Sequence, residues 1–189
     1  MTRILLVRHA EPAAPWHVAD DPGLSEQGVT QAEATAEALV HVQPARVLTS
    51  PMRRCQETAA PLAQRLSLTP DLEPRVTEVP SPATADRQAW LRATFPGAIE
   101  GGEARGWGAC GGEVLRWRAD VIAALCALQD DAVVFTHYVA INAAVSAALD
   151  VDLAMVCRPA HASVTELSSE QGVLRLVAHG AQVDGRRIA

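Results

Sequence analysis

Short apolar runs alternate with helical patterns along most of this chain, and this alternation limits the folds that it can adopt. Three of the runs have the length of a single strand, namely Ile4–Val7, Arg46–Thr49 and Ala132–Thr136. Strands that are separated by helices pair in parallel, because each helix carries the chain back across the sheet. Two further runs within residues 163–178 flank a short polar turn, which is typical of an antiparallel hairpin. The sequence therefore predicts an α/β fold, a three-layer α/β/α sandwich whose mainly parallel sheet carries a C-terminal antiparallel hairpin.

The helical patterns fill the stretches between these runs. Ser25 is placed to cap the first helix, which we expect to end near Val42. The segment 71–112 is rich in proline and glycine, so we expect only one short helix there. That short helix is Asp86–Thr94. The other predicted helices are Arg53–Leu66, Glu113–Leu128 and Ala140–Leu149. Because no repeat or linker interrupts the pattern, we predict that residues 1–189 form one domain.

The composition excludes several classes of partner. Of the 189 residues, 49% are hydrophobic and 20% are charged, as in ordinary globular proteins. The formal net charge of −6 gives no general basic face for nucleic acid. No apolar run has the length of a membrane span, and no signal-peptide pattern opens the chain. We therefore expect no nucleic-acid or membrane partner, whereas the oligomeric state stays open.

The cysteines indicate a reducing compartment. The chain contains Cys55, Cys110, Cys126 and Cys157. None of them forms a CxxC pair, and no histidine lies nearby at a spacing typical of zinc sites. We interpret them as reduced thiols in a cytoplasmic protein, with no metal ion bound through them.

Polar side chains follow each of the three predicted parallel strands. Arg8 and His9 end the first run, Ser50 follows the second shortly before Arg54, and His137 follows the third. The carboxyl ends of parallel strands meet at one edge of a sheet, where open α/β proteins place their reactive groups. Arginine matches the geometry of phosphate, and a neutral histidine offers a lone pair that can attack phosphorus. Two arginines and two histidines are therefore expected to meet at one edge of the sheet.

These strand ends resemble the motifs of the histidine phosphatase superfamily, the phosphoglycerate-mutase-like enzymes. The Arg8-His9 pair is similar to the first motif of that family. The second motif is a strand ending in Ser-Pro with an arginine three residues after the proline, a register that selects Arg54 rather than Arg53. His137 stands where the family usually has a Ser-His-Gly sequence.

Two further segments carry the same resemblance. Residues 24–32 read Leu-Ser-Glu-Gln-Gly-Val-Thr-Gln-Ala, which is similar to the Leu-Thr-x-x-Gly-x-x-Gln-Ala helix start of the family. Residues 75–78 resemble the segment that supplies an acidic proton donor, with Glu78 in that position and Glu73 as the competing carboxylate nearby. The motifs cover residues 4 to about 145 in the order of the family, so the resemblance implies the phosphoglycerate-mutase-like form of the α/β sandwich.

The resemblance implies a role for each of these residues. His9 would be the nucleophile that forms a phosphohistidine, while Arg8, Arg54 and His137 would bind the phosphoryl group. Glu78 would protonate the leaving oxygen and then deprotonate water. No cofactor or metal ion is implied. Among the other histidines, His17 could reach the site, whereas we interpret the rest as background, namely His41, His161 and His179.

Several departures from the family pattern concern the substrate. Ala10 replaces the usual glycine, and the loop 11–18 lacks the Trp-Asn pattern of the mutases. Residues 79–82 replace a Gly-x-Trp-Glu-Gly segment, and Tyr138 replaces the glycine after the second histidine. These changes favour a metal-independent phosphomonoesterase over a phosphoglycerate mutase. A protein phosphohistidine phosphatase and a non-catalytic domain that binds a phosphorylated ligand also fit the motifs. The expected partner is a small phosphorylated metabolite or a phosphoprotein.

Overall fold

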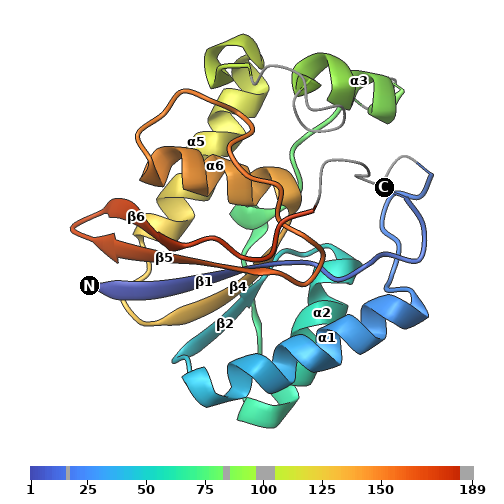
Figure 1. Ribbon diagram of the computed structural model, residues 1–189, viewed down its shortest axis with the longest axis vertical. Coiled ribbons are helices and arrows are strands. Elements are labelled where there is room, and N and C mark those ends of the chain that lie inside the picture. The colour runs from blue at the N-terminus through green and yellow to red at the C-terminus, as the bar shows by residue number, and fades with distance from the viewer. Residues whose placement is uncertain (16–17, 83–85, 97–104, 184–189) are drawn as a thin grey trace.

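The structure, a computed structural model, describes residues 1–15, 18–82, 86–96 and 105–183. Within them, six strands form one sheet in the order β3-β2-β4-β1-β5-β6 (Figure 1). The parallel part consists of β1 (Thr2–Arg8), β2 (Arg46–Thr49), β3 (Asp71–Leu72) and β4 (Ala132–Thr136). Because β1 and β2 both pair with β4 in parallel, all three strands end at the same edge of the sheet.

The C-terminal strands reverse the direction of the sheet. β5 (Val164–Glu170) pairs antiparallel with β1, and β6 (Val173–Ala178) pairs antiparallel with β5. The two residues of the connecting turn, Gln171 and Gly172, have φ values of 51° and 77°. Positive φ at both positions is what a type I′ turn requires, and this turn type suits the right-handed twist of a hairpin.

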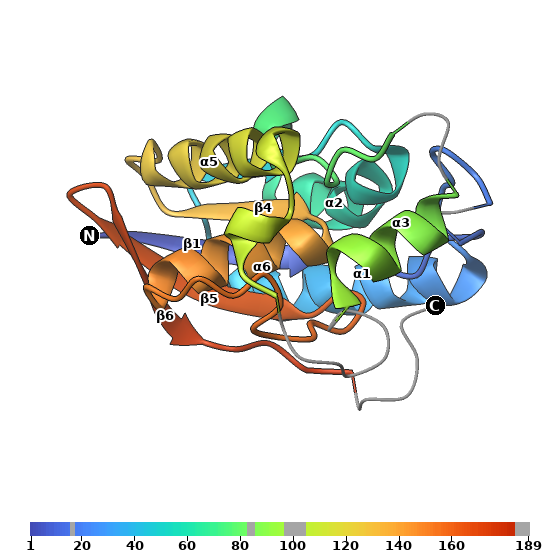
Figure 2. The same ribbon diagram turned by 90° about the horizontal axis from the view of Figure 1, so that it is seen from above.

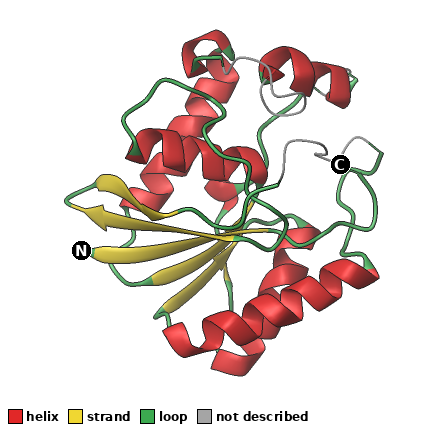
Figure 3. Ribbon diagram, in the orientation of Figure 1, coloured by secondary structure: helices red, strands yellow, loops and turns green. Residues whose placement is uncertain are grey.

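Helices cover both faces of the sheet, which Figures 1 and 3 show as a middle layer. On one face α1 (Glu26–Leu39) and α2 (Arg53–Leu66) pack against Leu5 and Val7. On the other face α5 (Gly112–Cys126) and α6 (Tyr138–Ala148) pack against Ile4 and Leu6. Successive side chains of β1 thus enter opposite cores, as the period of two in a strand dictates.

Shorter elements complete the described chain. They are α3 (Arg87–Thr94) and the 3-10 helices Val40–Val42, Pro74–Val76 and Trp107–Ala109. In Figure 2, α3 lies toward the end of the molecule that carries the loop after β1. An ion pair joins the two segments, with Arg87 Nη2 at 2.6 Å from Asp20 Oδ1.

The predicted fold class is confirmed, and the local differences concern short elements and the ends of helices; the helix predicted as Glu113–Leu128, for example, spans Gly112–Cys126. The final helix begins at Tyr138 rather than Ala140, because its first turn follows directly on the end of β4. The sequence does not predict the two-residue strand β3, since so short a strand leaves no hydrophobic pattern. The first helix ends at Leu39, and a 3-10 turn takes the chain to Val42. In the described part of the chain, no helix combines the length and hydrophobicity of a membrane span.

Candidate active site

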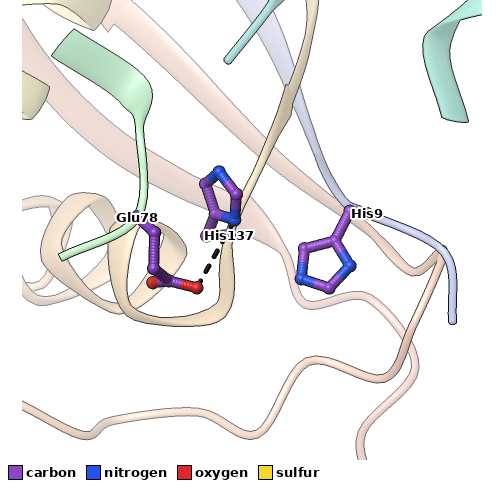
Figure 4. A group of neighbouring side chains, drawn as sticks. All are labelled: His9, Glu78 and His137. Carbon is purple, nitrogen blue, oxygen red and sulfur yellow. Dashed lines mark ion pairs between the residues drawn. The ribbon is translucent and has the colours of Figure 1, made fainter. Parts of the chain in front are cut away.

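The predicted site residues meet where the parallel strands end. His9 and His137 directly follow β1 and β4, and the backbone amide of His9 donates to the carbonyl of Thr136 at 2.9 Å. This bond continues the strand pairing for one residue, so the two imidazoles project side by side. Their ring centroids are 5.3 Å apart (Figure 4).

The imidazole of His9 is held as a neutral ring with one free nitrogen. Its Nδ1 lies 2.8 Å from the carbonyl oxygen of Ala10, which can only accept, so Nδ1 carries the proton. Burial lowers the pKa of His9 well below its usual value, and the nearby charges of His137, Arg8 and Arg54 lower it further. The ring is therefore neutral at physiological pH, and Nε2 has an unshared lone pair.

Arg54 enters the site from the first turn of α2, and it is only 2% exposed. Its Nη2 lies 3.1 Å from His137 Nδ1, while its Nη1 is buried without a hydrogen-bond partner among the described residues. Asp21 Oδ1 lies 3.9 Å from Nη1, as a long ion pair. By contrast, the side chain of Arg53 is 65% exposed and pairs with Glu57 along the helix. The register that selects Arg54 is thus the one that the fold places in the site.

Glu78 reaches the site on a segment that two neighbouring elements anchor. The hydroxyl of Thr136 donates to the carbonyl of Val76 at 2.6 Å, and the indole of Trp117 donates to that of Thr77 at 3.3 Å. Glu78 Oε2 then lies 3.4 Å from His137 Nδ1, the contact that the dashed line marks in Figure 4.

Glu78 is ionised in this arrangement. Burial acts to raise its pKa, but His137, Arg54 and the amide of Val79 outweigh burial and bring the pKa down to about 2. Arg54 Nη2 is 3.5 Å from Glu78 Oε2. The competing carboxylate, Glu73, instead pairs with Arg75 at 2.6 Å.

His137 is fully buried at the junction of these groups. Its Nε2 lies 2.8 Å from Ser50 Oγ, and its Nδ1 faces both the Arg54 donor and the Glu78 acceptor. Burial lowers the pKa of His137 despite the opposing effect of Glu78. The thiol of Cys55 touches the same ring at 3.4 Å, but burial raises its pKa, so it stays protonated and is no nucleophile.

Arg8 is the last residue of β1, directly before His9, and is 5% exposed. Its Nη1 donates to the carbonyl of Pro159 at 2.9 Å, and its Nη2 lies 2.8 Å from His161 Nε2. Its guanidinium carbon sits 5.1 Å from the centre of the Tyr138 ring. Burial lowers the pKa of Arg8 to about 10, so the side chain remains charged at neutral pH.

The loop after His9 is fixed by the start of α1. The amide of Glu11 donates to Gln31 Oε1 at 2.8 Å, and Ser25 Oγ caps the helix by accepting from the amide of Gly28 at 2.9 Å. A Cβ at Gly28 would overlap the backbone carbonyl of Glu11, so only glycine allows the helix to approach this closely. These contacts give a structural reason for the Leu-Ser-x-x-Gly-x-x-Gln pattern.

The five predicted site residues are therefore brought together from four separate segments. The structure places His161, which the sequence predicts to be background, beside the site, with its ring centroid 5.6 Å from that of His9. An isolated histidine in an irregular loop gives no sequence signal, and only the pairing of β5 with β1 brings it there. His41 and His179 lie on the surface, and His17 lies outside the described residues.

The arrangement suits an anion. One ligand atom from each of His9, Glu78 and His137 lies within 4.8 Å of the others, which is close enough to bind one metal ion. However, Arg8 and Arg54 place two positive charges beside the same space. Positive charge repels a metal cation and stabilises a phosphoryl group, so the geometry favours phosphate over metal.

The α/β sandwich, with buried histidines and arginines where its parallel strands end, has the form of the phosphoglycerate-mutase-like phosphatases. Residues 4–182 match the sequence pattern of the histidine phosphatase superfamily, branch 1. The chain belongs to this superfamily.

Similar proteins include two solved phosphatases and one uncharacterized protein. A mycobacterial glucosyl-3-phosphoglycerate phosphatase in complex with VO3 superposes with a TM-score of 0.68 and 26% identity, covering 96% of this chain and 100% of that one. A phosphoserine phosphatase mutant of Entamoeba histolytica in complex with phosphoserine shares the fold, with a TM-score of 0.73, 17% identity and coverage of 96% and 98%. An uncharacterized protein of Mycobacterium tuberculosis is 40% identical over 81 residues, which are 41% of this chain and 40% of that protein.

Proposed function

We propose that this protein is a metal-independent phosphatase that hydrolyses a phosphomonoester through a phosphohistidine on His9. The observation that carries the proposal is the free Nε2 of a neutral His9 within reach of the charges of two buried arginines, Arg8 and Arg54. Nδ1 is committed to the Ala10 carbonyl, so the lone pair on Nε2 is available to attack phosphorus. Arg8 and Arg54 supply positive charge where the transition state is negative.

The first half-reaction transfers the phosphoryl group to the enzyme. As the Nε2–P bond forms, the bond from phosphorus to the ester oxygen breaks, and Glu78 gives a proton to that oxygen. His137 donates to a phosphoryl oxygen. In the second half-reaction Glu78 takes a proton from water, whose oxygen attacks phosphorus and breaks the Nε2–P bond. Glu78 then passes that proton to the phosphate, which leaves as inorganic phosphate, and the free enzyme is restored with an ionised carboxylate.

Glu78 must gain a proton before it can act as an acid, since its pKa of about 2 leaves it ionised in the free enzyme. A bound phosphoryl group places negative charge beside the carboxylate and offsets the effect of Arg54. Both changes raise the carboxyl pKa, because an adjacent like charge disfavours the ionised form. A proton that arrives on the substrate monoanion can then pass to Glu78 within the site.

We further propose that the substrate is a small phosphorylated metabolite. The phosphatases that share this fold include a phosphoserine phosphatase and a glucosyl-3-phosphoglycerate phosphatase. The latter, at 26% identity over nearly the whole chain, gives the proposal its main support.

The test compares His9→Ala with His41→Ala, which removes an exposed histidine. We expect the wild type and the control to hydrolyse p-nitrophenyl phosphate, and His9→Ala to lose turnover while keeping its thermal unfolding midpoint. A radioactive phosphomonoester followed by alkaline quenching should leave label on His9, since phosphohistidine is acid-labile. Label on a serine or cysteine, or hydrolysis by His9→Ala at the wild-type rate, would overturn the mechanism.

A further inference from the structure

The site contains a third imidazole, His161, on the loop that leads into β5. The half-buried ring lies 5.6 Å from the His9 ring centroid and is tilted 39° from it. Its Nε2 contacts Nη2 of Arg8 at 2.8 Å. No role for this residue follows from the reaction described above, yet it contacts a proposed phosphate ligand directly.

The contact with Arg8 fixes the tautomer of His161. A guanidinium group can only donate, so Nε2 of His161 must accept, and the ring proton resides on Nδ1. Protonation of the ring would remove the acceptor and place two positive charges in contact. Burial, aided by the charge of Arg8, lowers the pKa of His161 to about 3. The histidine therefore acts as a neutral acceptor throughout the physiological pH range.

The loop that carries His161 is itself held against Arg8. The amide of Ala162 donates to the backbone carbonyl of Arg8 at 3.0 Å, and the amide of Arg8 donates to the carbonyl of Ser163 at 3.1 Å. From the other side, the hydroxyl of Thr35 donates to the carbonyl of Ala162 at 3.2 Å. These bonds tie one short loop to the strand end that carries the nucleophile.

The backbone is strained at this point. Ala162 has a φ of 57°, a left-handed conformation that a residue with a Cβ adopts only when its surroundings impose it. The strained residue directly follows His161 and orients the turn that presents the imidazole. Strain of this kind is concentrated where side chains must be placed with precision.

Arg8 has few other contacts that could orient it. Besides His161, its guanidinium donates to the carbonyl of Pro159 and lies over the ring of Tyr138. Its Nε is buried without a hydrogen-bond partner among the described residues. Two of its donors thus point into the loop 159–161, and this leaves the others for a ligand.

We propose that His161 is a positioning residue that holds Arg8 in the orientation required to bind the phosphoryl group. This inference rests on the proposed phosphatase function, because it assigns Arg8 to the phosphate. His161 does not need to touch the substrate. It acts by accepting one hydrogen bond from a buried, charged donor, a kind of bond that is stronger than one between neutral groups.

The test compares His161→Leu with His161→Gln. Leucine has a similar size but no acceptor, whereas the glutamine side-chain oxygen can reach the position of Nε2. We expect His161→Leu to raise the KM for p-nitrophenyl phosphate and the inhibition constant of vanadate about tenfold, the effect of losing one hydrogen bond to a charged group. His161→Gln should restore both constants to within about threefold of the wild type, and a control His41→Leu should change neither.

Direct binding of vanadate keeps this inference separate from the proposed function. Calorimetry measures vanadate affinity whether or not the protein turns over a substrate, so a wild type that binds without hydrolysis refutes the phosphatase and still tests His161. In an Arg8→Ala background, His161→Leu should have no further effect on vanadate affinity. A purely structural role would instead lower thermal stability and the active fraction at an unchanged inhibition constant. Three results would overturn the proposal. They are this structural outcome, a failure of His161→Gln to restore the constants, and additive effects of Arg8→Ala and His161→Leu on vanadate affinity.

Discussion

Replacing Glu78 with glutamine should destabilise the protein in a pH-dependent manner. The carboxyl pKa is about 2 in the folded chain against an ordinary value of 4.5. The ionised form is therefore about 3 kcal/mol more favourable in the folded than in the unfolded state, at 1.36 kcal/mol for each pH unit. Glutamine preserves the shape of the side chain but removes the charge that faces Arg54 at 3.5 Å. Near neutral pH, Glu78→Gln should lower the free energy of unfolding by about 3 kcal/mol.

The sign of the pH dependence follows from the direction of the pKa shift. A depressed carboxyl pKa contributes stability that is fully present above about pH 4.5 and is lost as the pH falls through about 2. The difference between wild type and Glu78→Gln should therefore stay constant from pH 7 to 5 and shrink to about 1 kcal/mol by pH 3.

Urea unfolding, followed by tryptophan fluorescence at several pH values, measures this difference. Glu170→Gln, an exposed substitution in the hairpin, should change the free energy of unfolding by less than about 0.5 kcal/mol at every pH. A Glu78→Gln penalty that is the same at pH 7 and pH 3, or no penalty at all, would refute the assigned ion pairing. The carboxyl group would then have an ordinary pKa, and the account of how it gains its proton would fail with it.

Three further predictions address the chemistry and the scaffold. Glu78→Gln should lower the rate of alkyl phosphate hydrolysis by a factor of about 10²–10⁴, but that of p-nitrophenyl phosphate far less, because an aryl oxide leaves without protonation. The control Glu73→Gln should change neither rate. Equal slowing of both substrates would place Glu78 in the dephosphorylation step instead. Activity should survive prolonged dialysis against EDTA, whereas a loss that Mg²⁺ or Zn²⁺ reverses would assign the His9, Glu78 and His137 cluster to a metal ion. Gly28→Ala should reduce the free energy of unfolding by about 1–3 kcal/mol and so lower the thermal unfolding midpoint, since the Cβ of the alanine overlaps the Glu11 carbonyl. An unchanged midpoint would show that the loop after His9 can move aside at little cost.

The strand-end motifs are predictable because they depend on short-range order. Arg8 and His9 directly follow an apolar run, and His137 follows another, so their positions at the edge of a parallel sheet follow from the pattern alone. The choice of Arg54 over Arg53 depends on one residue of register within a helix turn, and the fold buries Arg54 while Arg53 faces solvent.

Other features of the site arise only from contacts between distant segments. The resemblance of residues 75–78 to a family segment favours Glu78 over Glu73, but the sequence does not show which carboxylate turns inward. The anchoring of this segment by Thr136 and Trp117 places Glu78 in the site. The protonation states of the site residues also depend on contacts between distant segments. Neighbouring charges and hydrogen bonds lower the pKa of Glu78, and burial with neighbouring charges keeps His9 neutral.

The sequence by itself determined the α/β sandwich, the family and four of the strand-end and helix-start side chains at the site, because these depend on hydrophobic periodicity and on residues adjacent to it. Only the tertiary structure decided how Arg8 is held. His161 lies 153 residues from Arg8 in the chain, and no local pattern encodes that contact. It exists because β5 pairs antiparallel with β1 and brings the start of one strand beside the end of the other.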